Sequence, residues 1–283
     1  MSNIYFKQFH KLDDILIDTA NFLIESMKVM MEVPSVLQIK QSAITHMLEL
    51  MSNVLSKNQV PRILEIGCGH GANAYFMAKN TNGNIIAIDS SNRMITQAHN
   101  SFTHPKIQYY VADEEKMLDL GFAEYFDACH ADRLLVSSLN YELLFENVVR
   151  LVKPAGVLTF TDVDASSITI TPYTNITKII LEQLKRNFVN KSMGSELAQL
   201  FLRNNLQNIT AIPANSTITS FAILSKIFQF AEIIQQVVQQ KLITVKDGEK
   251  WFDDMVKAEL LGDFKCTVKF TTVHANKPLL STL

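Results

Sequence analysis

The chain of 283 residues is longer than one average domain and suits a large α/β domain that carries an insertion. Its 26 basic and 28 acidic side chains give a formal net charge of -2, without any block of like charges. This balance disfavours a nucleic-acid backbone as the main partner, so a small molecule is the expected ligand.

The cysteines and the N-terminus are those expected of a cytoplasmic protein. Cys68, Cys129 and Cys266 lie far apart without CxxC spacing, so we expect no zinc site and no disulfide framework. The first ten residues lack the basic and apolar regions of a signal peptide. No window offers about 18 uninterrupted apolar residues, and we expect no membrane span.

Two helical patterns precede the first strand. Apolar residues recur at three- and four-residue spacing over 13–31, and Pro34 is expected to end this helix. A second helical pattern runs over 36–55. We assign residues 1–55 to an N-terminal helical cap.

Short apolar runs separated by turns follow, and helical segments separate several of them. Strands that alternate with helices predict an α/β fold whose parallel sheet is covered on both faces. The expected strands are residues 62–66, 84–88, 107–111, 126–129, 156–161, 208–213 and 267–273. We assign the core to 56–219 and its final strand to 263–283.

Residues 220–262 are expected to form a helical insertion between the last two strands. Thr244 and Asp247 have the spacing of a capping box at the start of its second helix, and Gly262 is expected to end that helix. Its aromatic residues either close over a pocket as a lid or pack the insertion onto the sheet. Packing is the commoner role of apolar residues at helical spacing.

A glycine-rich loop follows the first strand, in the sequence Ile63-Leu-Glu-Ile-Gly-Cys-Gly-His-Gly71. Glycines between a strand and a helix let the backbone approach a nucleotide closely. Because Gly67-x-Gly69-x-x-Ala72 also satisfies the dinucleotide fingerprint of dehydrogenases, the glycines alone leave two cofactors open.

Three acidic residues bear on this choice, although an acidic residue at the position of Asp89 is shared with NAD enzymes. Glu65 precedes the loop, where a carboxylate accepts hydrogen bonds from an ammonium group and repels a pyrophosphate. S-adenosylmethionine carries an amino acid and no phosphate, so Glu65 favours it over NAD. Asp89 ends the next strand about 20 residues beyond the loop, which suits a ribose diol. Asp113 follows the third strand, where it suits the exocyclic amine of adenine.

With Phe126-Asp-Ala-Cys-His130 and Lys153-Pro-Ala-Gly156 following in order, the sequence resembles the class I S-adenosylmethionine-dependent methyltransferases. It is most similar to the small-molecule branch that includes the ubiquinone and menaquinone biosynthesis methyltransferases. The resemblance implies a Rossmann-like, doubly wound, mostly parallel seven-stranded sheet with an antiparallel last strand. N-terminal helices and a helical lid insertion before that strand complete the implied fold.

The resemblance also implies which residues bind the cofactor. The glycine loop holds the methionine part, Asp89 binds the ribose, Met94 packs on the adenine and Asp113 contacts its amine. The implied cofactor residues are Glu65, Gly67, Cys68, Gly69, Gly71, Asp89, Ser90, Met94, Asp113, Glu114 and Ala131.

Methyl transfer from a sulfonium is an in-line displacement that needs alignment, no metal, and a base only when the acceptor must lose a proton. His130 is the candidate base, since it is expected to follow the fourth strand at the carboxyl edge of the sheet. Its alternative role is a hydrogen-bonded residue at a helix entry. Asp162 and Asp164 either contact the acceptor or cap the next segment. Arg133 is expected to be a surface or packing residue.

We therefore predict a methyltransferase (EC 2.1.1.-) that methylates a small molecule. One alternative is a non-catalytic S-adenosylmethionine-binding protein that lost its acceptor site. Another is a NAD-dependent oxidoreductase, against which Glu65 argues. A nucleic-acid methyltransferase is disfavoured by the charge and by the absence of an Asn-Pro-Pro-Tyr type of motif after the fourth strand.

Overall fold

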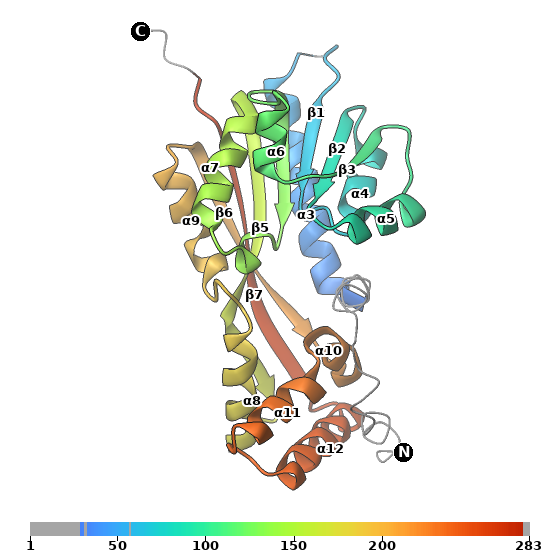
Figure 1. The fold of residues 1–283 in the computed structure, drawn as a ribbon, viewed down its shortest axis with the longest axis vertical. Coiled ribbons are helices and arrows are strands. Elements are labelled where there is room, and N and C mark those ends of the chain that lie inside the picture. Colours follow the sequence, from blue (N-terminus) through green and yellow to red (C-terminus); the bar gives the residue numbers. More distant parts are fainter. Residues whose placement is uncertain (1–28, 31–32, 57, 280–283) are drawn as a thin grey trace.

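The computed structural model describes residues 29–30, 33–56 and 58–279, which form a seven-stranded sheet with helices on both faces (Figure 1). The strand order is β3-β2-β1-β4-β5-β7-β6. Neighbours from β3 to β5 are parallel, whereas β7 runs antiparallel to both β5 and β6. The predicted fold class, with its antiparallel last strand, is confirmed.

The strands are β1 (Arg62–Ile66), β2 (Asn84–Asp89), β3 (Ile107–Val111), β4 (Phe126–Asp132), β5 (Val152–Thr171), β6 (Gln207–Ile218) and β7 (Lys265–Asn276). The helices are α3 (Pro34–Val54), α4 (Ala72–Asn80), α5 (Asn92–Ser101), α6 (Glu114–Asp119), η1 (Leu135–Ser137), α7 (Tyr141–Leu151), α8 (Asn175–Arg186), α9 (Met193–Arg203), α10 (Phe221–Phe228), α11 (Phe230–Gln239) and α12 (Val245–Leu261). Most of the helix predicted over 13–31 lies outside the described residues.

Two hydrophobic cores lie on the two faces of the sheet. Helices α3, α4 and α5 cover one face, where Met47 and Met77 pack against Ile63 of β1. Helices α6, α7 and α9 cover the other face, where the ring of Phe145 lies 5.1 Å from that of Phe160. The alternation of side chains along each strand thus separates two apolar layers, as a sheet covered on both faces requires.

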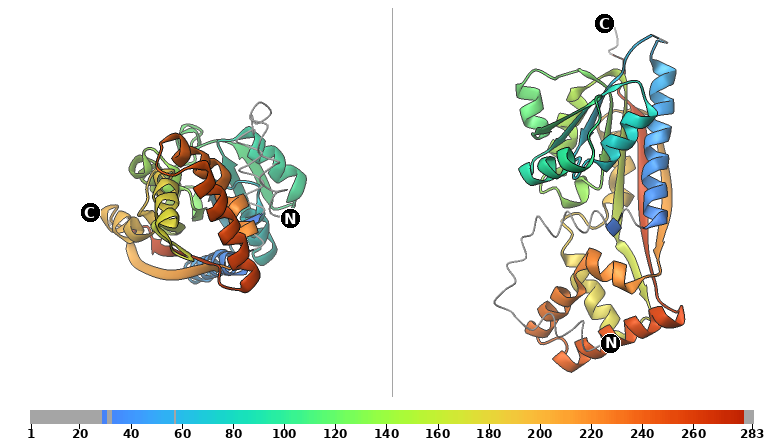
Figure 2. Two further views of the ribbon diagram at one scale, coloured as in Figure 1. Left: turned by 90° about the horizontal axis from the view of Figure 1, so that it is seen from below. Right: turned by 90° about the vertical axis from the view of Figure 1, so that its right-hand side faces the viewer.

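Strand β5 is much longer than the segment 156–161 that we predicted. It spans 20 residues and runs with β6 and β7 past the carboxyl ends of β1 to β4 (Figures 1 and 2). Asp164 and Ser166 interrupt the apolar pattern at the centre of β5, so the sequence pattern does not indicate that the strand continues beyond them. The strand regains β-branched residues at Ile168 and Ile170, which are both 1% exposed and pack into the core.

The far ends of these long strands carry a helical unit, which we define as α8, α10, α11 and α12 (Figure 1). Its interior holds Trp251, 2% exposed, whose Nε1 donates a hydrogen bond of 2.9 Å to Thr177 Oγ1 of α8. The rings of Phe221 and Phe230 lie 5.7 and 5.3 Å from that of Trp251. The aromatic residues of the insertion therefore pack among the helices of this unit.

The insertion contains three helices rather than the two expected. Gln229 adopts a left-handed φ of 50° and separates α10 from α11. The predicted capping box is present at the start of α12, where Thr244 and Asp247 bond each other's backbone N–H groups at 3.2 and 2.9 Å. Gly262, at φ 78°, ends this helix as predicted.

No single helix in the described part of the chain is long and apolar enough to cross a bilayer. The pair α10 and α11, bent by 62°, passes the same test of length and composition only when the two are taken together. Phe221, Leu224, Phe230 and Ile234 of this pair are buried against the rest of the molecule.

Candidate functional site

The glycine loop between β1 and α4 has a left-handed backbone at its three glycines, and two of them have no room for a side chain. Gly67, Gly69 and Gly71 have φ values of 66°, 52° and 92°, which side chains rarely adopt. A Cβ atom at Gly67 would lie 2.9 Å from Cδ1 of Leu134, and one at Gly71 would lie 2.6 Å from Oη of Tyr109. The side chains of Leu134 and Tyr109 therefore pack directly against the loop, at the carboxyl edge of the sheet.

Asp89, at the end of β2, fixes the loop to the neighbouring strand. Its Oδ2 accepts a hydrogen bond of 3.0 Å from the N–H of Gly69, and its Oδ1 accepts one of 2.9 Å from the N–H of Ser91. Cys68 strengthens this link because its N–H donates to the carbonyl of Ile88 at 2.9 Å. Each carboxylate oxygen of Asp89 keeps a second lone pair, so the contact with the loop is compatible with a ribose diol.

The remaining residues expected at the adenosine lie on the two adjacent segments. Met94 is 4% exposed in the first turn of α5, after the exposed Ser90 and the helix cap Ser91. Asp113 is exposed and caps α6, accepting a hydrogen bond of 2.9 Å from the N–H of Lys116. Asp89 pairs in register with Val111, which brings Asp113 to the same edge.

Glu65 and His130 form a buried pair beneath the loop. They are neighbours in register on β1 and β4, and Glu65 Oε2 lies 2.7 Å from His130 Nδ1 with both side chains 1% exposed. Glu65 Oε1 also accepts a hydrogen bond of 3.4 Å from Asn73 Nδ2. Burial lowers the pKa of His130, but the Glu65 carboxylate outweighs it and places that pKa above its ordinary value.

The expectation that His130 follows the fourth strand is wrong. Strand β4 continues to Asp132, so His130 and Ala131 lie within it, at 0% and 1% exposure. The apolar pattern stops at Cys129 because His130 and Asp132, on the opposite face of the strand, are polar, although His130 is fully buried. The His130 ring thus contacts a carboxylate inside the fold instead of the open carboxyl edge.

Asp162 lies in the middle of β5, whereas we predicted it at the edge of a shorter strand. Its carboxylate, 1% exposed, accepts hydrogen bonds of 2.9, 3.2 and 2.9 Å from the N–H groups of Leu135, Val136 and Val163. Burial raises the pKa of Asp162 to about 7. These contacts give Asp162 the role of an anchor for the turn after β4.

Asp164 is also inside β5 and also buried, at 6% exposure. It accepts hydrogen bonds from the hydroxyls of Ser166 and Ser195. Ser195 belongs to α9, which approaches so closely that a Cβ at Gly194 would lie 2.8 Å from the backbone nitrogen of Asp164. The carboxylate therefore joins α9 to the sheet.

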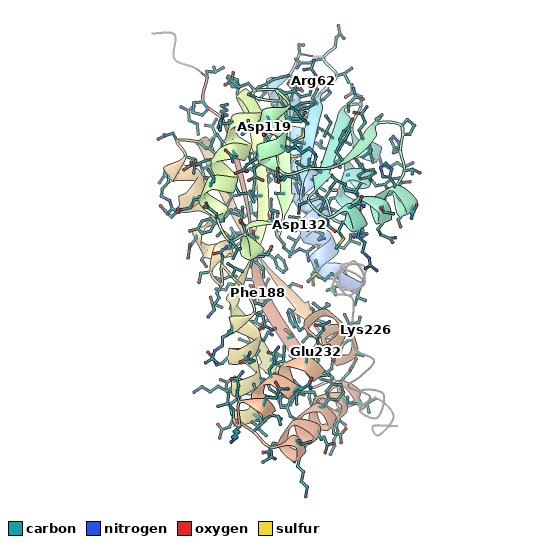
Figure 3. The ribbon with its side chains drawn as sticks, viewed as in Figure 1. Arg62, Asp119, Asp132, Phe188, Lys226 and Glu232 are labelled. Carbon is teal, nitrogen blue, oxygen red and sulfur yellow. The ribbon has the colours of Figure 1, made fainter. Side chains whose placement is uncertain are left out.

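A cluster that the sequence analysis missed lies beside the loop. Asp132 Oδ2 is 2.9 Å from Lys40 Nζ of α3 and 2.9 Å from Arg133 Nη2. Asp132 marks the carboxyl end of β4, at the opposite end of the core from Arg62 at the start of β1 (Figure 3). Lys40 continues the apolar stripe of Val36, Ile44 and Met47 at helical spacing, and a lysine at such a position was the signal available in the sequence.

Arg133 was expected to be a surface or packing residue, and the structure buries most of its side chain. It has a left-handed φ of 53°, and its side chain is 15% exposed. Lys40, Asp132 and Arg133 line a small cavity of about 30 Å³ over the glycine loop. The other lining residues are Gly67, Cys68, Gly69, His70, Ala72 and Asn73.

The protein has the α/β fold of the methyltransferases whose methyl donor is S-adenosylmethionine. Residues 63–156 match the family described as "Methyltransferase domain". A search of curated proteins gave no match.

Solved methyltransferase structures share the fold at low sequence identity. The YcgJ protein of Bacillus subtilis is 18% identical with a TM-score of 0.56, and the match covers 83% of this chain and 99% of that one. A putative methyltransferase of Bacillus halodurans is 14% identical with a TM-score of 0.55 and the same coverage. Phosphoethanolamine N-methyltransferase 2 of Haemonchus contortus, in complex with S-adenosylmethionine, is 16% identical with a TM-score of 0.50. The match covers 83% of this chain and about half, 52%, of the Haemonchus enzyme.

Proposed function

We propose that this protein methylates a small-molecule acceptor with S-adenosylmethionine. The observation that carries the proposal is the glycine loop fixed by Asp89 at the carboxyl edge of a methyltransferase sheet. In such sheets ligands bind outside the carboxyl ends of the strands. The bound cofactor would supply an electrophilic methyl group, and the protein would hold and align the two reactants.

The cofactor residues implied by the sequence remain our proposal, and the geometry refines their roles. The loop backbone would receive the methionine part, Asp89 the ribose and Asp113 the adenine amine. Glu65 is enclosed by His130 and Asn73, so we assign it to support of the loop from below. Ala131 supports the same region from within β4.

A small acceptor would bind at the carboxyl edge of β1 to β4. The long strands carry the helical unit beyond this edge (Figure 1). The balanced net charge of -2 agrees with this assignment.

The residues predicted as catalytic are bonded to other groups of the protein. This favours a mechanism in which the protein aligns the acceptor with the methyl group and supplies no base. His130 is paired with Glu65, and Asp162 and Asp164 hold backbone and hydroxyl groups. An acceptor whose attacking atom already has a free lone pair needs no base in the protein. We therefore propose an amine, a thiolate or a similarly activated acceptor.

The same burial favours the alternative of a protein that binds the cofactor without catalysis. The test is transfer of a radiolabelled methyl group from S-adenosylmethionine to a panel of small amines, thiols, phenols and carboxylates, beside calorimetric binding of S-adenosylhomocysteine. We expect binding and transfer to at least one acceptor. Binding without transfer to any acceptor would support the non-catalytic alternative, and stabilisation against heat by NAD alone would replace both with an oxidoreductase.

A further inference from the structure

A cavity of about 290 Å³ lies between α3 and the strands β6 and β7, and we call it the α3–β7 cavity. Ser35 lines it, and Oγ of Ser35 lies 2.8 Å from Oγ of Ser216 in β6. This contact holds the start of α3 over the strands. The other polar residues that line the cavity are Gln38, Ser42, Asn215, Thr272 and His274.

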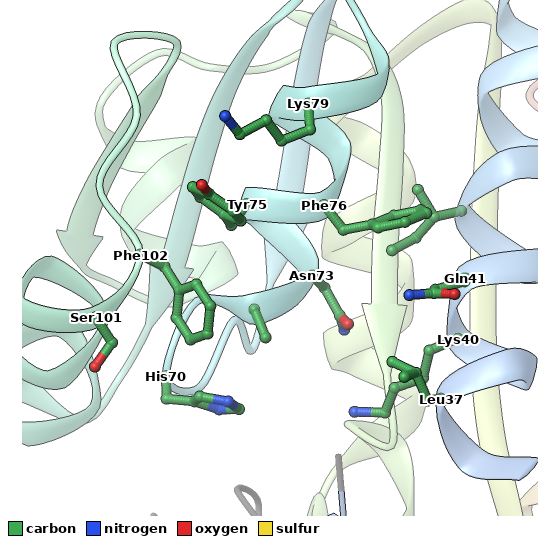
Figure 4. A pocket seen from close by; sticks show the side chains of 12 residues that line it. Leu37, Lys40, Gln41, His70, Asn73, Tyr75, Phe76, Lys79, Ser101 and Phe102 are labelled. Carbon is green, nitrogen blue, oxygen red and sulfur yellow. The ribbon is translucent and has the colours of Figure 1, made fainter. Parts of the chain in front are cut away.

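The α3–β7 cavity is separate from the proposed cofactor site. Helix α3 borders the glycine loop with its opposite side, where Figure 4 shows Leu37 and Gln41 facing Asn73 and Phe76 of α4 across another cavity. Among the residues that the structure describes, these two cavities share no lining residue. In the sheet, β4 and β5 lie between β1, which carries the loop, and β7. A ligand of the α3–β7 cavity would therefore not be the methyl acceptor.

The floor of the cavity contains a buried nitrogen that lacks a partner. Thr272 and His274 are 5% and 1% exposed. Oγ1 of Thr272 lies 2.8 Å from Oγ1 of Thr161, and Nδ1 of His274 lies 2.8 Å from Oγ1 of Thr159. Within the described part of the chain, Nε2 of His274 has no hydrogen-bond partner. Because an unpaired buried polar atom is costly, a ligand that bonds Nε2 would stabilise the fold.

The lining indicates an uncharged ligand with an apolar body. The described side chains that line the cavity are uncharged, since burial first lowers the pKa of His274 to about 3 and keeps its ring neutral. A charged ligand would lose its hydration here without a counter-charge. Ile39 and Ala43 supply apolar walls, and the exposed amides of Gln38 and Asn215 lie at the rim.

A hydroxyl group is the best match for the unpaired nitrogen. A neutral imidazole has one nitrogen that donates and one that accepts, and the bond to Thr159 selects which of them is Nε2. A hydroxyl both donates and accepts, so it suits Nε2 in either form, whereas a carbonyl or an ammonium group suits only one. An apolar cavity of about 150 Å³ holds benzene, so the α3–β7 cavity has room for a substituted ring.

We propose that the α3–β7 cavity binds a small uncharged alcohol or phenol. Its hydroxyl bonds Nε2 of His274, and its apolar body lies between Ile39 of α3 and Ala214 of β6. This makes the protein a two-ligand protein, with the second ligand held on the side of α3 that faces away from the glycine loop.

The test compares three probes of similar size: 4-methylphenol, toluene, which lacks only the hydroxyl, and 4-methylbenzoate, which carries a charge. Titration of the full chain at pH 7.5, followed by NMR, measures their affinities. We expect 4-methylphenol to bind at least about 10-fold more tightly than either other probe, because it satisfies a buried nitrogen. Spectra of ¹⁵N-labelled histidine rings should show a shift at Nε2 of His274, assigned from His274→Gln, and none at the exposed His99.

Two variants fill the cavity from different walls and leave His274 in place. Ala214→Leu extends a side chain from β6, and Ser42→Leu does so from an exposed position of α3. Each should weaken 4-methylphenol by at least about 10-fold, since a close-packed interior has no spare volume. Ala211→Leu is the matched control, because Ala211 is exposed and faces the other side of β6. It should leave the affinity unchanged.

Equal affinity of the wild type for 4-methylphenol and toluene would overturn the proposal, as would the absence of any binding of 4-methylphenol. An affinity that Ala214→Leu or Ser42→Leu leaves unchanged would place the probe elsewhere and refute the site. One of these two variants is sufficient, provided that its circular dichroism matches that of the wild type. The measurement needs no S-adenosylmethionine, so failure of the proposed function would leave its result standing.

Discussion

Glu65 and His130 face each other across β1 and β4 at 2.7 Å, and neither side chain reaches solvent. Such a pair is costly to break, because the remaining partner is left buried without its counter-charge. The raised pKa of His130 means that the folded state holds its proton more tightly than the unfolded state. The stabilisation is therefore complete below the ordinary pKa of histidine and is lost as the pH rises through the folded pKa.

We expect Glu65→Gln to reduce the free energy of unfolding by about 2–4 kcal/mol at pH 5.5, and by clearly less at pH 9. Urea unfolding at both values measures this difference. Glu49→Gln is the control, since Glu49 is 67% exposed and lies 3.8 Å from the half-exposed His46, and it should change stability by less than about 0.5 kcal/mol. An equal loss for Glu65→Gln at both pH values would refute the charged pair.

We expect His274 to give the free energy of unfolding the opposite dependence on pH. Burial first, and then the neighbouring His46 and His130, lower the pKa of His274 to about 3. Its Nδ1 lies 2.8 Å from Thr159 Oγ1. Between about pH 6.5 and 3, His274 is protonated in the unfolded chain but neutral in the folded state. Acid therefore destabilises the fold in this window.

His274→Gln should flatten that acid dependence, because glutamine keeps a polar partner for Thr159 and does not titrate. We expect the stability of the wild type to fall more steeply between pH 6 and 4, by up to about 1.4 kcal/mol per pH unit relative to the variant. Parallel urea titrations across this range check the prediction. Identical slopes for the two proteins would show that His274 titrates normally.

Asp113 combines a helix cap with its proposed contact to adenine, and two substitutions separate these roles. Asp113→Ser keeps a cap for α6 but withdraws the carboxylate, whereas Asp113→Ala removes both. We expect both variants to bind S-adenosylhomocysteine more weakly, by about 10-fold if a hydrogen bond to the amine is lost. Only Asp113→Ala should also lower the melting temperature. Unchanged calorimetric affinity of Asp113→Ser would remove Asp113 from the proposed site.

Trp251 is the only tryptophan in the sequence, and its fluorescence therefore reports on the helical unit alone. Thr177→Val should remove the hydrogen bond to Nε1 and destabilise the fold by about 1–2 kcal/mol, since it leaves a buried donor unpaired. The emission of Trp251 during urea unfolding measures this. Thr177→Ser, which keeps the hydroxyl, should retain most of the stability, and equal losses in both variants would assign the effect to packing.

Much of the core was predictable from the sequence because its signals are local. Glycines before a helix, acidic residues after strands, and the Thr244 to Asp247 spacing each depend on neighbouring residues alone. The length of β5 was not predictable in this way. Asp162 and Asp164 look like residues at a strand end until the partners that bury them are known, namely the backbone around Leu135 and the hydroxyl of Ser195.

The same limit applied to the candidate site. His130 was assigned from its distance to the end of a strand, and a strand that continues three residues past Cys129 reverses that placement. The ion pair of Lys40 with Asp132 joins residues more than ninety positions apart. Contacts of this range are set by the topology of the sheet, which a local pattern does not contain.

The continuous strands also determine how the two halves of the molecule are able to move. A flap on a flexible linker rotates about a few backbone bonds, but the helical unit is attached to the core through three strands of the same sheet. Its approach to the carboxyl edge would have to be an elastic bend of the sheet itself, and the register shift of β5 against β7 between Asp164 and Thr169 is the place of least pairing. Stiffening this one segment would slow the entry and release of a ligand without altering any residue that touches it.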